Sequence, residues 1–112
     1  MIPNICKQKH KAAEREIRRI VKGYKPEKVI IFGSLARGDI NRGSDLDLIL
    51  IKETEERFDR RIETVLKYVK GEIGVEPIIY TRGELSMLLK QKNDFLETVL
   101  AEGKVVYEKQ RQ

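Results

Sequence analysis

Two aspartates separated by a single residue are the side chains whose types and spacing best suit chemistry. Asp45 and Asp47 flank Leu46 at the start of an apolar segment that predicts a strand, so both carboxylates project from one face, about 7 Å apart. Like charges this close repel each other unless a cation lies between them. Carboxylate oxygens without nearby His or Cys suit Mg²⁺ or Mn²⁺. The sequence therefore predicts a divalent cation at Asp45 and Asp47.

A glycine–serine pair lies upstream of these acids, with ten residues between Ser34 and Asp45. Gly33 and Ser34 follow an apolar strand segment directly, where a glycine lets a ligand approach the backbone and free N–H groups favour phosphate. The Ser34 hydroxyl can add a hydrogen bond, and Arg37 and Arg42 could meet phosphate charge. A cation site beside a phosphate cradle is what nucleotide phosphoryl transfer needs.

A third acid is expected, because two-metal chemistry needs a group that completes the metal site or takes a proton. Glu76 opens a predicted third strand and shares one of its faces with Ile78 and Tyr80. If this strand neighbours the one that follows Asp45, Glu76 reaches the aspartate pair. Pro77 favours an edge position for this strand.

Each feature also has an ordinary structural explanation. An acid-x-acid pair alone is most often a solvated strand end, Gly-Ser an ordinary turn, and Glu76 an exposed acid at a strand start. Arg37 could equally form an ion pair with Asp39. The combination at this spacing, in a strand–turn–strand context, favours the functional interpretation.

The elements that must position these residues follow from hydrophobic periodicity and turn residues. Helices are predicted over 7–22, over 55–70, after Thr81 with Glu84 completing a capping box, and after Asn93 or Asp94. Strands are predicted over 28–32, 46–51, 76–80 and 105–107. This order predicts an α/β (α+β) fold in one domain, 1–112, with a small mixed sheet of three to four strands and helices packed on it.

Composition narrows the function classes. The chain has 112 residues, 40% apolar and 37% charged, with no run of about 18 apolar residues and no signal peptide, so a cytoplasmic protein without a membrane segment is expected. A single cysteine, Cys6, and a single histidine, His10, exclude an internal disulfide and Cys or His metal clusters. Residues 1–28, which include the first predicted helix, carry nine Lys and Arg against three Glu. We interpret the basic face of this helix as a solvated surface. Direct nucleic-acid binding is a weaker hypothesis, because residues 6–23 contain no Phe, Tyr or Trp.

The motif resembles that of the nucleotidyltransferase superfamily typified by DNA polymerase β, and the short length resembles its minimal nucleotidyltransferases. The resemblance rests on Gly33-Ser34, the spacer, Asp45-x-Asp47 and the later Glu76, and extends more loosely to EGKVVYE near the end. It implies a polymerase β-like fold in which Asp45, Asp47 and Glu76 are catalytic and hold two Mg²⁺ ions. It also implies that Gly33 and Ser34 bind the triphosphate of an NTP.

The same resemblance implies Mg²⁺-dependent transfer of a nucleoside monophosphate, AMP from ATP, to a hydroxyl. Minimal members commonly work with a small helical HEPN protein, often a toxin ribonuclease, as its antitoxin, and can attach AMP to a tyrosine. The chain offers no separate acceptor site, so we expect an open groove flanked by Ile78, Tyr80 and 84–90, completed by a HEPN-type partner or a second copy.

The alternative is a non-catalytic antitoxin that masks its toxin. The family's third acid is more often Asp than Glu, and a masking protein would tolerate the departure at Glu76-Pro77.

Overall fold

The computed structural model describes residues 4–110. Residues 1–3 and 111–112 of the predicted domain lie outside the described residues. The elements in chain order are α1 (Asn4–Tyr24), β1 (Lys28–Phe32), α2 (Ser34–Arg37), β2 (Leu46–Ile51), α3 (Phe58–Leu66), β3 (Val75–Tyr80), α4 (Arg82–Lys90), α5 (Asp94–Glu102) and β4 (Lys104–Glu108).

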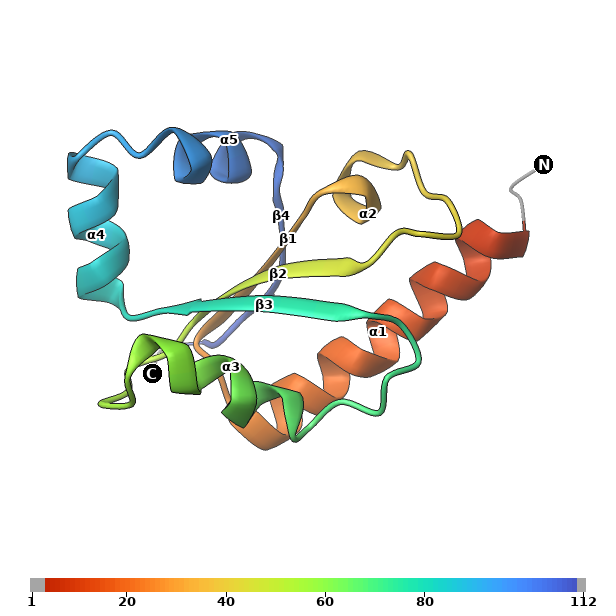
Figure 1. The fold of residues 1–112 in the computed structure, drawn as a ribbon, viewed down its shortest axis with the longest axis horizontal. Coiled ribbons are helices and arrows are strands. Elements are labelled where there is room, and N and C mark those ends of the chain that lie inside the picture. Colours follow the sequence, from red (N-terminus) through yellow and green to blue (C-terminus); the bar gives the residue numbers. More distant parts are fainter. Residues whose placement is uncertain (1–3, 111–112) are drawn as a thin grey trace.

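The four strands form one mixed sheet in the order β3-β2-β1-β4. β1 runs antiparallel to both β2 and β4, whereas β2 and β3 are parallel. Figure 1 shows α1 and α3 on one side of this sheet and α4 and α5 on the other. The predicted fold class, a small mixed sheet with helices packed on it, is confirmed.

Each face of the sheet carries its own apolar cluster, because side chains alternate along β2. One cluster joins the sheet to α1 and α3 through Leu46, Leu48 and Leu50 of β2, Ile20 and Tyr24 of α1, and Val65 of α3. The other joins it to α5 through Ile49 and Ile51 of β2, Ile30 of β1, and Leu96 and Val99 of α5. The aspartates at the start of β2 therefore lie where the second cluster meets solvent.

The strands match their predicted bounds closely, with β1 and β2 as predicted and Pro77 in the edge strand β3, as expected. The helix predicted over 55–70 is shorter, Phe58–Leu66. Its C-terminal end is set from a distance, because the Glu16 carboxylate accepts hydrogen bonds from the N–H groups of Lys70 and Gly71. These two N–H groups therefore cannot donate to backbone carbonyls, as they would if the helix continued.

The predicted capping box of α4 is confirmed, with Thr81 and Glu84 exchanging hydrogen bonds. Arg61 of α3 adds two bonds to the Glu84 carboxylate, at 2.6 and 3.1 Å. Arg61 is the main reason why the pKa of Glu84 falls to about 2. Asn93 caps α5. None of the helices within residues 4–110 is both long and apolar enough to cross a bilayer.

Candidate functional site

Asp47, Glu76 and Phe32 form a row across three strands. Asp47 of β2 pairs in register with Glu76 of β3 on one side and with Phe32 of β1 on the other. Paired residues of neighbouring strands point to the same face, so the two carboxylates and the aromatic ring share one end of the sheet. The structure thus brings Glu76 beside Asp47, the placement on which the third-acid hypothesis depended.

Gly33 holds a backbone conformation that only glycine adopts readily, with φ 73° and ψ −157°. The Asp47 carboxylate lies directly against its Cα: a Cβ at this position would stand 3.3 Å from Asp47 Cγ and closer still to Oδ2. Glycine is therefore required at this position for two reasons: the backbone dihedral angles, and the close approach of the Asp47 carboxylate. The space that a side chain would take at Gly33 is occupied by the Asp47 carboxylate, so the two residues are in direct contact.

Asp47 is the titratable group most affected by this arrangement. Burial is the main cause of a raised pKa, which reaches about 6, and the hydrogen bond and charge of the Glu76 carboxyl add to it. The charge of Asp45 raises the pKa further, and Arg37 lowers it. A cation among these acids would relieve that repulsion, because it favours the ionised form of each.

Asp45 lies just before β2 and packs differently from Asp47. Its carboxylate contacts Gly74 at the start of β3, where a Cβ would stand 2.9 Å from Asp45 Cγ. The Leu46 N–H donates to the Gly74 carbonyl at 2.7 Å and fixes this contact. Within the described part of the chain, no three acidic, His or Cys side chains are grouped closely enough to hold one metal ion together. The donor types fit Mg²⁺, with Asp47 and Glu76 as the adjacent pair and Asp45 beside them.

Ser34 forms part of a small hydroxyl network that the sequence did not reveal. Its Oγ donates to Ser44 Oγ at 2.9 Å, and Ser44 Oγ accepts from the Asn41 N–H at 2.9 Å. Lys9 of α1 donates to the Ser44 carbonyl at 2.8 Å. Ser44, which is buried, ties the loop before the acids to the serine after Gly33. Its one sequence signal is its position next to Asp45.

The two arginines are placed differently. Arg37, exposed on α2, pairs with Asp39 at 3.3 Å and with Glu102 of α5 at 3.8 Å. The ion pair with Asp39, the alternative noted from sequence, therefore forms, while the Arg37 charge still reaches Asp47. Arg42 is exposed in the loop, and no described contact brings it to the acids.

Glu16 stabilises the turn that precedes β3, and the sequence analysis did not identify it. The side chain, fully buried on α1, accepts hydrogen bonds from the N–H groups of Lys70, Gly71 and Glu72 at 2.7–3.2 Å. Burial alone would raise its pKa, but these bonds and the Arg19 guanidinium hold the pKa below its ordinary value. This contact fixes the turn that leads to Gly74, the residue that the Asp45 carboxylate contacts.

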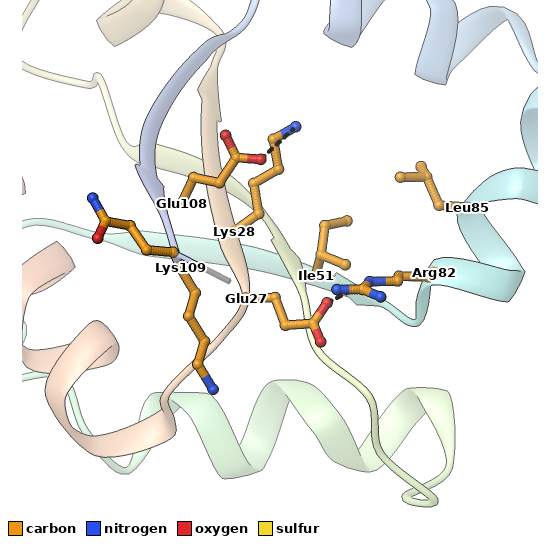
Figure 2. A pocket seen from close by; sticks show the side chains of 8 residues that line it. Glu27, Lys28, Ile51, Arg82, Leu85, Glu108 and Lys109 are labelled. Carbon is orange, nitrogen blue, oxygen red and sulfur yellow. Dashed lines mark ion pairs between the residues drawn. The ribbon is translucent and has the colours of Figure 1, made fainter. Parts of the chain in front are cut away.

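The expected groove beside Ile78 and Tyr80 stays a prediction. Both residues are half-buried and pack against the second apolar cluster, as do Leu85 and Leu88 of α4. A groove of about 860 Å³ lies at the opposite end of the sheet, and Figure 2 shows two ion pairs among its lining residues, Lys28–Glu108 and Glu27–Arg82. Its lining includes Lys28, at the far end of β1 from Phe32.

The sequence matches the family model described as "Polymerase beta, Nucleotidyltransferase" over residues 15–112. A protein of Methanocaldococcus jannaschii provisionally named a protein adenylyltransferase is 41% identical over 76 residues, which cover 64% of this chain and 76% of that protein.

Two solved structures share the fold. One, provisionally described as a nucleotidyltransferase from Sulfolobus solfataricus, superposes with a TM-score of 0.64 at 22% identity, over 93% of this chain and 84% of that one. The other, described as a toxin–antitoxin with AMP-PNP, superposes with a TM-score of 0.61 at 21% identity, over 87% of this chain and 74% of that one. The family match spans all four strands and every residue of the site. The chain therefore belongs to the polymerase beta nucleotidyltransferase family.

Proposed function

We propose that this nucleotidyltransferase moves AMP from ATP, in the presence of Mg²⁺, to a hydroxyl group of a partner protein. The observation that carries the proposal is the acidic cluster at one end of the sheet. There Asp47 lies against Gly33 and beside Glu76, with a pKa of about 6 that burial and its acidic neighbours raise.

The three acids have different roles because they differ in position and exposure. Asp45, Asp47 and Glu76 would hold Mg²⁺, which supplies charge neutralisation for the triphosphate and a lowered pKa for the acceptor hydroxyl. Glu76 is the most exposed of the three, in the edge strand β3, so an incoming hydroxyl can reach it. Glu76 either takes the hydroxyl proton or completes the metal site.

The phosphates would lie at Gly33 and Ser34, on the side of Asp47 that faces away from Glu76. Gly33 carries no side chain and lies against the Asp47 carboxylate, and the Ser34 hydroxyl is held at a fixed position by Ser44. Arg37, already close enough to affect the Asp47 pKa, would meet the phosphate charge by exchanging its exposed pairs with Asp39 and Glu102. Arg42 would contribute from the loop.

A protein acceptor is supported by the comparisons. The Methanocaldococcus relative carries the name of a protein adenylyltransferase, and one neighbour of the fold is a toxin–antitoxin complex. We infer a small helical toxin of the HEPN type as the partner, with a hydroxyl side chain that docks at Glu76. Completion of the site by a second copy of this chain is the other arrangement.

The test uses ATP labelled at the α-phosphorus, with Mg²⁺ and the candidate partner. Label should pass to the partner with the wild type and not with Asp47→Asn or Glu76→Gln. Asp59→Asn, which alters an exposed acid on α3, is the matched control and should transfer normally. A parallel reaction uses ATP labelled at the γ-phosphorus, and passage of that label to the partner would contradict nucleotidyl transfer.

A second candidate function is neutralisation by masking alone. The observation that favours it is that the three acids are not grouped as a ready metal site. Under this alternative, Asp47→Asn would neutralise the toxin as well as the wild type does.

A further inference from the structure

Phe95 is a large apolar side chain that remains 47% exposed although its helix is firmly packed. Its neighbours on α5, Leu96 and Val99, are 0% and 4% exposed and fill the second apolar cluster. Burial of α5 therefore does not require an aromatic ring at position 95, and a solvated ring gains little stability there.

The Phe95 ring packs against the ring of Phe32. The two ring centroids are 5.8 Å apart and the ring planes meet at 85°, an edge-to-face arrangement. Phe32 directly precedes Gly33 and pairs in register with Asp47. The two rings thus form an aromatic corner beside Gly33 and the acids, with Phe95 at its solvent side.

A flat heteroaromatic ring suits such a corner. A nucleobase can stack on the exposed Phe95 ring, and base–aromatic stacking contributes substantially to nucleotide binding without depending on the base. In the proposed function, the phosphates lie at Gly33 and the metal ion lies at Asp47. The nucleoside attached to these phosphates must therefore extend outward from this end of the sheet. The corner is the aromatic surface adjoining both positions.

We propose that Phe95, braced by Phe32, binds the base of the nucleoside triphosphate. This inference rests on the proposed function, because it places the base relative to the phosphate and metal positions assigned there. The corner consists of two Phe rings without hydrogen-bonding groups. It would therefore favour a nucleotide over bare triphosphate without itself selecting between adenine and guanine.

A fluorescence measurement tests the contact directly. The chain contains no Trp, so Phe95→Trp introduces a single indole at the corner. Mg·ATP should quench it saturably, whereas Mg·tripolyphosphate should not. Leu100→Trp is the matched control: Leu100 is 38% exposed on the same helix but about 140° around its axis, so ATP should leave its fluorescence unchanged.

Calorimetry separates this inference from the proposed function. Phe95→Ala should weaken Mg·ATP binding roughly five- to a hundredfold and leave tripolyphosphate binding unchanged, with thermal melting to verify folding. Unaltered ATP affinity in Phe95→Ala, with no quenching in Phe95→Trp, would overturn the base site while the nucleotidyltransferase proposal stands. If the wild type binds neither ATP nor tripolyphosphate, both proposals fail together.

Discussion

Burial of the Asp47 carboxylate destabilises the unliganded protein, and the same carboxylate is proposed to bind the metal ion. Its carboxylate is partly buried between Gly33 and Glu76, and its raised pKa shows that the charged form is disfavoured in the unliganded protein. A bound cation would reverse this preference, because it stabilises the ionised carboxylate. The residue therefore couples protonation, metal binding and stability at one position.

Asp47→Asn should make the unliganded protein more stable than the wild type above pH 6. The folded-state pKa of about 6 lies above the ordinary 3.8, so the folded protein holds a proton that the unfolded chain releases. Wild-type stability should therefore fall as pH rises from about 4 to 6, and the variant should escape this loss. We expect a gain of about 1 kcal/mol at pH 7.5, because partial exposure screens the effect.

Urea unfolding between pH 4 and 8 measures this difference, with Asp59→Asn as control. A variant that is less stable than the wild type at pH 7.5 would show that Asp47 is not under electrostatic strain.

Gly33→Ala should destabilise the protein by about 1–3 kcal/mol and abolish Mg·ATP binding, because alanine disfavours the positive φ and its Cβ would displace Asp47. Gly38→Ala is a matched control: its φ is also positive, at 93°, but a Cβ there meets nothing within 4 Å. Gly38→Ala should lose stability and still bind Mg·ATP in calorimetry. Equal ATP affinities in the two variants would remove Gly33 from the site.

Part of this residue-scale picture could be predicted from sequence. Strand alternation and spacing were sufficient to single out Asp47 and Gly33, because both depend on local geometry. The contacts of Ser44 and Gly74 could not be predicted, since they depend on how two loops fold against other segments.

At the scale of elements, Glu16 joins α1 to the turn that carries the chain into β3. Glu16→Gln removes the charge that serves three N–H groups, and we expect a loss of about 2–3 kcal/mol in urea unfolding at pH 7. Glu14→Gln, an exposed change on the same helix, should cost almost nothing.

The wild type should also lose the Glu16 contribution on acidification, since a lowered pKa gives stability that is present above the ordinary 4.5 and lost as pH falls. Equal stability of the two glutamine variants would contradict this role.

The same contact explains which elements could be predicted. The strand bounds follow from short apolar runs, and Thr81 and Asn93 predicted two helix starts through local capping. The end of α3 could not be predicted, because Glu16, whose side chain stops it, lies far earlier in the chain, 54 residues before Lys70.

At the scale of the whole molecule, two apolar clusters on opposite faces support a sheet with the acids at one end and the large groove at the other. The fold class could be predicted, because the order of elements restricts it. The groove could not, since Glu27, Arg82 and Glu108 reach it from three distant segments (Figure 2). In the proposed function, a partner protein docks at the end of the sheet that carries the acids.

The central claim is that these acids catalyse transfer of AMP to a partner, and the intact mass of that partner tests it most directly. A purified HEPN-type toxin incubated with ATP, Mg²⁺ and the wild type should gain the mass of one AMP. With Asp47→Asn, or with the metal chelated, its mass should stay unchanged although the two proteins still bind each other. A toxin that is neutralised by the wild type without any gain in mass would contradict the claim.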